Sequence, residues 1–401
     1  MWRDLTHITR LTVFGRRSRR MGKVTEKTVR ILHVLGRLDR GGAETMVMNL
    51  YRHMDRERIQ FDFVIHTEDV CDYTEEIQRM GGRIYSMRPF RWNTAAGYRR
   101  QWRKFLRVHP EYSIIHGHMR STASLYLAEA RRAGRVAIAH SHNTSSGSGL
   151  SAVVKNILQF PLRFQADYLF ACSVQAGIWL YGRRACQSHR FHVLPNGIET
   201  AAFQFDAGRR QKIRQELLGS GASDMPVFVH AGRMEPQKNH DFLIQVMEEV
   251  RKLCPDACLW LCGSGPLQGR LEDVVRASGL PVRFLGVRTD MAALLQAADG
   301  MIFPSLFEGL PVTLVEAQAA GLPVLMSDTI TREVVLTGLV ETLPLAAPPA
   351  QWARRGLEMA RQVRNRSEFA GMIRQRGYDA AENARKLARF YRGVLERHGS
   401  R

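Results

Sequence analysis

The stretch Glu308-Gly-Leu-Pro-Val-Thr-Leu-Val-Glu316 places two carboxylates around the start of a helix. Pro311 suits the first helical turn, because its missing N–H group needs no partner there. Glu308 is therefore expected in the preceding loop and Glu316 in the second turn, on one face with Val312 and Ala319. An ionised carboxylate on an apolar face is costly unless donors meet it, and sugar or ribose hydroxyls are such donors. The alternative is structural: Glu308 favours the helix N-terminus, and Glu316 bonds a neighbouring backbone group or arginine.

A longer run around these carboxylates, together with other segments, carries a resemblance to a known family. The run is Phe303-Pro-Ser-Leu-Phe-Glu-Gly-Leu-Pro followed by Glu316-Ala-Gln-Ala-Ala-Gly-Leu-Pro-Val. The other segments are Gly41-Gly-Ala-Glu, His116-Gly-His, His140-Ser-His-Asn, Pro195-Asn-Gly-Ile-Glu and Gly232-Arg-(x)4-Lys238-Asn. In this order and spacing, from about residue 28 to 397, they resemble retaining GT-B glycosyltransferases of family 4, in the exopolysaccharide and capsule branch.

Short β-rich apolar runs alternate with helical patterns along the chain, which is typical of parallel sheets with crossover helices. The expected strands are Val29–Leu35, Phe61–His66, Arg83–Met87, Ser113–His116, Val136–His140, Tyr168–Cys172 and Phe191–Leu194, then Val227–Ala231, Ala257–Cys262, Val282–Leu285, Gly300–Phe303 and Val324–Met326. This pattern predicts an α/β protein with two doubly wound domains. The resemblance implies the GT-B arrangement, in which two Rossmann-like domains face a central cleft and a C-terminal helix crosses back to the first domain.

The length of 401 residues favours two hydrophobic cores over one. We expect a basic, flexible extension over residues 1–28, an acceptor-side domain over 29–197, a nucleotide-sugar-binding domain over 198–378 and a C-terminal helix over 379–401. The main boundary falls at Pro195-Asn-Gly, where these three residue types together mark a tight connection.

The composition is that of a globular protein, with 45% hydrophobic and 24% charged residues. No apolar run reaches the roughly 18–20 residues that a membrane helix needs. The six cysteines are scattered without zinc spacing, and no secretory signal is recognisable, so reduced thiols in the cytoplasm are expected.

The net charge of +20 is unusual, and the first thirty residues carry nine basic residues against Asp4 and Glu26. One interpretation is a solvated lead-in, with Met21 as an alternative start. Another is a peripheral anchor to the anionic inner face of the plasma membrane, worth on the order of 1 kcal/mol per basic residue. Nucleic-acid binding is a third, but no recognisable nucleic-acid motif supports it.

Arg233 and Lys238 follow the strand Val227–Ala231 and precede a helix, a position that predicts an anion site. An arginine can fork onto phosphate oxygens, while a lysine acts as a point charge; an exposed basic turn is the alternative. The resemblance implies that this pair binds the donor diphosphate, that Glu316 binds the ribose, and that Glu308 binds the hydroxyls of the donor sugar. Gly309 and Leu310 belong to the same donor-binding set.

Glycine-containing loops after other strands are further candidates. Gly41 and Gly42 allow a bound group to approach the backbone, and the resemblance implies contact with the donor phosphates and the acceptor. Gly263, Gly286 and Val287 lie after strands of the second sheet, where backbone groups could hold the nucleotide base. The alternative for Gly263, Gly286 and Val287 is that they are ordinary turn residues.

Among the 14 histidines, His118 lies just past a strand end, where a ligand-binding residue is expected. The resemblance implies that it hydrogen-bonds the transferred sugar. His116, inside the strand, is interpreted as a core residue, and His140 and His142 are secondary candidates. None has Asp or Cys companions at metal-ligand spacing, so no metal site is expected.

The resemblance thus implies a metal-independent, retaining glycosyltransferase of the hexosyltransferase class, acting in exopolysaccharide, capsule or related glycan biosynthesis. The expected donor is a nucleoside diphosphate sugar, with UDP favoured over GDP and no further cofactor. The expected acceptor is a glycan or lipid-linked oligosaccharide. The alternatives are a nucleotide-sugar epimerase, a phosphorylase, a glycosidase with Glu308 and Glu316 as its acid pair, and a non-catalytic partner in a polysaccharide-synthesis complex.

Overall fold

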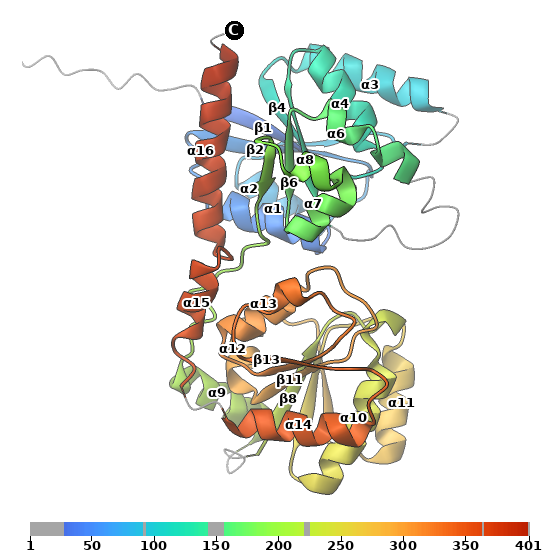
Figure 1. The fold of residues 1–401 in the computed structure, drawn as a ribbon, viewed down its shortest axis with the longest axis vertical. Coiled ribbons are helices and arrows are strands. Elements are labelled where there is room, and N and C mark those ends of the chain that lie inside the picture. Colours follow the sequence, from blue (N-terminus) through green and yellow to red (C-terminus); the bar gives the residue numbers. More distant parts are fainter. Residues whose placement is uncertain (1–27, 91–93, 143–155, 220–224, 363–364, 400–401) are drawn as a thin grey trace, which may run out of the picture.

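The computed structural model describes residues 28–90, 94–142, 156–219, 225–362 and 365–399, which form two α/β domains stacked along the long axis of the molecule (Figure 1). The basic extension over residues 1–27 lies outside the described residues. Within them, no helix combines the length and the apolar character needed to cross a bilayer.

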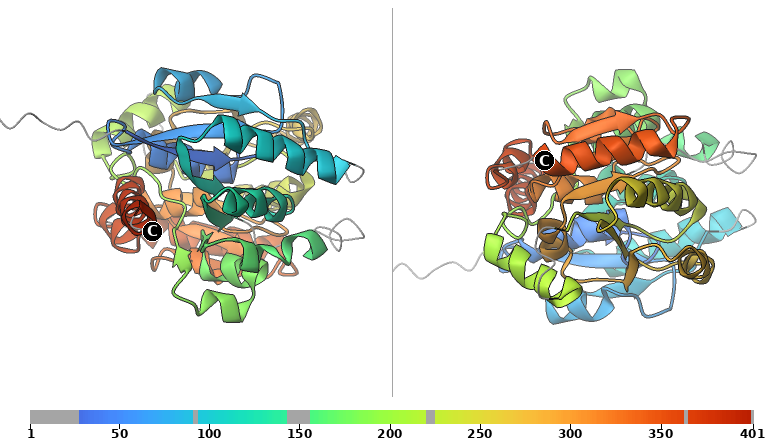
Figure 2. Two further views of the ribbon diagram at one scale, coloured as in Figure 1. Left: turned by 90° about the horizontal axis from the view of Figure 1, so that it is seen from above. Right: turned by 90° about the horizontal axis from the view of Figure 1, so that it is seen from below.

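The first domain is built on a seven-stranded parallel sheet with the order β3-β2-β1-β4-β5-β6-β7. Its strands are β1 (Val29–Val34), β2 (Ile59–Ile65), β3 (Ile84–Ser86), β4 (Tyr112–Gly117), β5 (Val136–Ser141), β6 (Tyr168–Ala171) and β7 (Phe191–Val193). Its helices are α1 (Gly42–Arg52), α2 (Thr74–Arg79), α3 (Ala95–Val108), α4 (Ala123–Arg132), α6 (Leu162–Gln165), α7 (Val174–Tyr181) and α8 (Arg183–Cys186). Helices cover both faces of the sheet (Figure 2), which gives one core on each side.

The second domain has a six-stranded parallel sheet with the order β10-β9-β8-β11-β12-β13. Its strands are β8 (Val227–Ala231), β9 (Cys258–Cys262), β10 (Val282–Gly286), β11 (Gly300–Phe303), β12 (Val324–Ser327) and β13 (Val340–Leu343). Its helices are α9 (Ala207–Leu218), α10 (His240–Leu253), α11 (Gln268–Ser278), α12 (Met291–Ala297), α13 (Val312–Ala319), α14 (Pro349–Gln362) and α15 (Phe369–Gln375), with short 3-10 turns η2 (Pro236–Lys238) and η3 (Arg332–Val334).

These sheets confirm the predicted fold of two doubly wound domains, and every expected strand is present within a few residues of its predicted bounds. One strand, β13, is absent from the prediction. In both sheets the strand order reverses at one place, between β1 and β4 and between β8 and β11. Ligands of doubly wound sheets bind beyond the carboxyl ends of the strands at such a point.

The carboxyl edges of the two sheets face each other. The backbone N–H of Gln175, at the start of α7 just after β6, donates to Oε1 of Glu333 at 3.2 Å. Glu333 belongs to η3, which follows β12 in the other domain. Both segments follow the carboxyl end of a strand, and all strands within each sheet are parallel. The contact therefore lies between the carboxyl edges of the two sheets.

Two chain segments cross side by side between the domains. Leu194 packs in a core of the first domain and Ile198 in a core of the second, so the chain leaves the first domain between them. On the way back, Asp379 forms a parallel bridge with Ile198. The chain then enters α16 (Ala380–Gly399), which lies along the first domain (Figure 1). There the hydroxyl of Tyr391 lies 2.6 Å from Nδ1 of His116, which confirms that the last helix crosses back.

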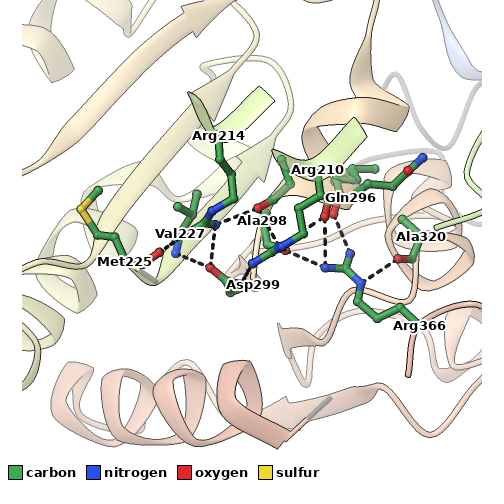
Figure 3. A network of polar contacts seen from close by, with 11 residues as sticks. Arg210, Arg214, Met225, Val227, Gln296, Ala298, Asp299, Ala320 and Arg366 are labelled. Carbon is green, nitrogen blue, oxygen red and sulfur yellow. Dashed lines mark hydrogen bonds and ion pairs between the residues drawn. The ribbon is translucent and has the colours of Figure 1, made fainter. Parts of the chain in front are cut away.

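A buried arginine joins two helices of the second domain (Figure 3). Arg366, 7% exposed, donates to the carbonyls of Leu295 and Ala298 at the end of α12, both at 2.8 Å. It also donates to the carbonyl of Ala320 at the end of α13, at 3.0 Å. The last carbonyls of a helix have no partner within the helix, so one guanidinium satisfies two helix ends. It thereby fixes α13, which carries Glu316.

Candidate active site

Lys238 and Glu308 come together at the point where the strand order of the second sheet reverses. Lys238 ends η2 after β8, and Glu308 follows the adjacent strand β11. The Nζ atom of Lys238 lies 2.6 Å from Oε1 of Glu308, and the side chains are only 16% and 10% exposed. The ammonium also lies 4.7 Å from the ring centroid of Phe303, within the range of a cation–π contact. A positive charge is therefore fixed where a ligand of this fold would bind.

The two loops that carry this ion pair are hydrogen-bonded to each other. The backbone N–H of Leu306 donates to the carbonyl of Gln237 at 2.8 Å, and the side-chain amide of Gln237 donates to the carbonyl of Phe307 at 2.9 Å. Asn239 adopts a left-handed conformation with φ of 56° and donates to the carbonyl of Pro304 at 3.2 Å. The geometry of the pair is thus set by the backbone before any ligand binds.

Glycines allow the neighbouring loops to approach this place closely. A Cβ atom on Gly263 would lie 2.1 Å from the carbonyl oxygen of Gly232, and its φ of 130° also requires glycine. A Cβ atom on Gly232 would lie 2.8 Å from Cε of Lys238. The N–H of Gly263 donates to the carbonyl of Gly286 at 2.7 Å, and Val287 beside it is 64% exposed. The candidate base-binding residues therefore lie in one connected set of loops.

Arg233 differs from Lys238 in its surroundings. Its side chain is 77% exposed, and its guanidinium lies 3.0 Å from Oε1 of Glu235. Lys238 is therefore held in place by a buried ion pair, whereas Arg233 is an exposed cation at the start of the same loop.

The side-chain carboxyl of Glu316 makes no hydrogen bond or ion pair with any described residue, although Glu316 is half-buried on α13. Burial raises the pKa of its carboxyl to about 7, because the ionised form loses water without gaining a partner. The structural alternative, in which the carboxyl of Glu316 bonds a backbone group or an arginine, has no support among the described residues.

The helix α13 begins at Val312, and Pro311 is its N-cap residue with an extended ψ of 109°. Pro311 therefore lies one position before the first helical turn, in which it was predicted. Gly309 and Leu310 lie in the loop just before it, and Leu310 packs against the core.

In the first domain, Gly41 and Gly42 form the start of α1. A Cβ atom on Gly41 would lie 2.3 Å from a carboxylate oxygen of Glu44, so a larger residue there would displace the Glu44 side chain. Burial raises the pKa of the Glu44 carboxyl. This loop lies beyond the carboxyl end of β1, next to the point where the order of the first sheet reverses.

Five histidines gather on one face of the first sheet, at or just past the carboxyl ends of three adjacent strands. They are His33 on β1, His116 and His118 on or just after β4, and His140 and His142 on or just after β5. We call this set the histidine cluster. Side chains at alternate positions of a strand share a face, and the rings stack with centroids 4.2–5.3 Å apart for neighbours such as His140 and His142 or His116 and His140.

Hydrogen bonds connect the rings of the histidine cluster. His118 is central, with Nε2 at 2.9 Å from Nδ1 of His33 and Nδ1 at 2.9 Å from Nε2 of His142. Nε2 of His116 lies 3.2 Å from Nδ1 of His140. Burial lowers the pKa of all five rings, that of His142 to about 3, so they are neutral near pH 7.

Sequence reasoning selected His118 and ranked His140 and His142 behind it, but it separated His116 from them and did not single out His33. The signal that links them is the pattern His-x-His at the end of two consecutive expected strands. If those strands are neighbours in the sheet, their histidines must meet on one face.

Comparisons with known proteins show the family of the chain. A family model described as "Glycosyltransferase Family 4" matches residues 40–202, and one described as "Glycosyl transferases group 1" matches residues 225–362. "Putative glycosyltransferase EpsF" of Bacillus subtilis (strain 168) is 38% identical over 384 residues, which cover 93% of this chain and 98% of that protein.

More distant similarities extend the comparison. The "UDP-Gal:alpha-D-GlcNAc-diphosphoundecaprenol alpha-1,3-galactosyltransferase" of Escherichia coli is 27% identical over 231 residues, 54% of this chain and 58% of that protein. The crystal structure of Anabaena Alr3699/HepE in complex with UDP and glucose superimposes with a TM-score of 0.70 over 91% of this chain and all of that chain (100%). Its sequence identity of 19% limits this last likeness to the fold.

Proposed function

The chain belongs to the family 4 glycosyltransferases, and we propose that it transfers a sugar, with retention of anomeric configuration, from a nucleoside diphosphate sugar to a lipid-linked or growing polysaccharide acceptor. The observation that carries this proposal is the buried Lys238–Glu308 pair, in the loop that leads into the helix carrying the half-buried, unpartnered carboxyl of Glu316. One fixed cation suits a diphosphate, and free carboxylate oxygens suit hydroxyl donors.

The donor occupies the carboxyl edge of the second sheet in this proposal. Lys238 and Arg233 bind the diphosphate, Glu316 accepts hydrogen bonds from the ribose hydroxyls, and Glu308 accepts them from the sugar. Glu308 has two carboxylate oxygens, and the ion pair with Lys238 engages one of them. The other oxygen remains for a hydroxyl group of the sugar. The loops of Gly263, Gly286 and Val287 take the base.

The first domain supplies the acceptor side. His118 bonds the transferred sugar, and the loop at Gly41 and Gly42 contacts the phosphates and the acceptor. When the bond from the anomeric carbon to the diphosphate oxygen breaks, the electron pair leaves with the diphosphate, and Lys238 and Arg233 stabilise its growing charge. The acceptor hydroxyl attacks from the same face, and its proton passes to the departing phosphate oxygen.

A UDP-sugar donor and a lipid-diphosphate-linked acceptor are the finer parts of the proposal. They are supported by the E. coli relative, whose name gives UDP-Gal as donor and a diphosphoundecaprenol acceptor. A GDP-sugar remains the alternative donor. We place the enzyme in the cytoplasm, in peripheral contact with the anionic inner face of the plasma membrane, where a lipid-linked acceptor would be reached.

Two measurements test the proposal. Thermal-shift assays against UDP, GDP and their sugars should show a higher melting temperature with the correct nucleotide, since a ligand that binds only the folded state stabilises it. Proton NMR of the transferred or hydrolysed sugar should then show the anomeric configuration of the donor. An inverted product contradicts the retaining reaction. Release of sugar from a simple glycoside without a nucleotide would indicate a glycosidase instead.

A further inference from the structure

Three nitrogen ligands for a metal ion converge in the histidine cluster. One ring nitrogen from each of His118, His140 and His142 lies within 4.8 Å of the other two. A second triad, made of His33, His116 and His118, meets the same criterion and shares His118 with the first. Three imidazoles that leave a fourth position open form a common zinc-binding arrangement in proteins.

Two of these rings carry ring nitrogens that lack any partner. Nε2 of His140 and Nδ1 of His142 are buried and have no hydrogen bond within the described residues. A buried polar atom without a partner is costly, and each such atom calls for an explanation. A neutral imidazole nitrogen without a hydrogen presents a lone pair, which is what a metal ion needs. Each of these two rings is held by a hydrogen bond at its other nitrogen, His140 through Nδ1 and His142 through Nε2.

The two triads differ in depth. His118 and His142 are half-buried, whereas His33, His116 and His140 are 0–2% exposed. The first triad therefore lies nearer the carboxyl edge of the sheet, while the second triad lies deeper. His116 is held by the hydroxyl of Tyr391 at 2.6 Å, which keeps it out of the first triad.

We propose that His118, His140 and His142 form a binding site for a single divalent transition-metal ion such as Zn²⁺, Cu²⁺ or Ni²⁺. The all-nitrogen ligand set selects these ions over Mg²⁺ and Ca²⁺, which require oxygen ligands. This site goes beyond the proposed sugar transfer and does not depend on it.

The test uses the full chain, stripped with EDTA and freed of the chelator, and Co²⁺ and Cu²⁺ as spectroscopic probes. Co²⁺ should bind one ion per chain and give the strong visible d–d bands of a tetrahedral site, without the charge-transfer band of thiolate ligands. Electron paramagnetic resonance of bound Cu²⁺ should show coupling to imidazole nitrogens. This measurement needs no variant, so it tests the site even if substitutions impair folding.

Substitutions then locate the ligands. His140→Asn and His142→Ala should each weaken Co²⁺ binding by at least about 100-fold, since loss of a partner outside the coordination shell already costs 10–100-fold. His192→Asn is the matched control, because His192 lies on β7 in the same sheet, contacts Phe170 on the same face, and is outside the cluster. It should leave binding unchanged. Binding that is absent in the wild type, that shows thiolate bands, or that survives both substitutions overturns the proposal.

Discussion

The Nζ atom of Lys238 and Oε1 of Glu308 lie 2.6 Å apart, although the two residues are separated by 70 positions in the sequence. The two residues were predicted separately, Lys238 as a ligand of the diphosphate and Glu308 as a ligand of the sugar. Their pairing explains how a largely buried ammonium is held ready: the carboxylate compensates its charge in the free enzyme. A diphosphate then adds to an existing ion pair and does not meet an isolated buried cation.

This pairing predicts different behaviour for the two cations. Lys238→Ala and Arg233→Ala should each lower turnover by about 100- to 1000-fold, the usual effect of removing a charge aimed at a developing anion. Lys238→Ala should also lower the free energy of unfolding by about 3 kcal/mol, because it leaves Glu308 buried and unpaired. Arg233 is exposed, so Arg233→Ala should leave the melting temperature unchanged.

Steady-state kinetics and thermal melts check both effects, and Lys252→Ala is the control. Lys252 pairs with Glu249 at 2.6 Å but is 67% exposed on α10, so its loss should change neither quantity. Full turnover by the Arg233 variant would remove that residue from the proposed mechanism.

Glu316 should make nucleotide binding depend on pH. Its carboxyl has a pKa of about 7 in the free protein, and ribose hydroxyls that donate to it favour the ionised form. Binding therefore releases a proton below that pH, and the affinity should rise between about pH 6 and pH 8. Glu316→Gln should weaken binding by about 1–3 kcal/mol at the upper end of this range. Calorimetry with UDP measures both, and the variant corrects for titration of the ligand's own phosphate. An identical pH profile in the two proteins would make Glu316 a structural residue.

Removal of metal ions should leave turnover unchanged, whereas addition of Zn²⁺ should lower it. Because protein cations stabilise the leaving group in the proposed mechanism, activity should survive EDTA. Added Zn²⁺ should lower activity, because the ion binds His118, the residue that would otherwise bond the sugar. The comparison is a rate assay with EDTA, with Zn²⁺, and with Zn²⁺ followed by EDTA. Loss of activity in EDTA would transfer the leaving-group role to an ion.

The buried arginine of the second domain should matter for stability and for Glu316. Arg366→Met keeps much of the side-chain volume but leaves carbonyls of α12 and α13 without donors, at a cost of about 1–3 kcal/mol. We expect a lower midpoint in urea unfolding and weaker binding of UDP, because α13 loses its fixed end. Arg361→Met on α14, whose side chain is exposed, serves as the control.

The basic lead-in should attach the protein to membranes without contributing to the fold. Removal of residues 1–20 should leave the melting temperature unchanged and reduce sedimentation with vesicles that contain anionic lipid, most clearly at low salt. Vesicles of neutral lipid are the control. Equal sedimentation of both forms with anionic vesicles would exclude the anchor, and a large loss of stability would mean that the segment packs on the folded domains.

The sequence predicted the sheets well because buried parallel strands are short apolar runs, as in Val227–Ala231 and Gly300–Phe303. The missed strand, Val340–Leu343, lies at the edge of its sheet and is half-buried along its whole length. Glu341 and Thr342 interrupt its apolar character, so it lacks the continuous signal of a central strand.

The site was harder to predict, because its key relationships join residues that are distant in sequence. No local pattern shows that Lys238 pairs with Glu308, since that contact depends on β8 and β11 being neighbours. The same holds for the histidine cluster. The spacing of His118 and His142 along the chain resembles no metal motif, because a helix separates the strands that bring them together.

The path of α16 has a consequence for the order in which the chain folds during synthesis. Ala384, Leu387, Tyr391 and Val394 belong to a core of the first domain, together with side chains of α1 and β2. When the ribosome has finished residues 29–197, that apolar face is still uncovered, and it stays so while the whole second domain is made. N-terminal domains usually fold first as they emerge. Here the second domain is the first that can complete its core, and the first domain closes last, when residues near 394 leave the exit tunnel.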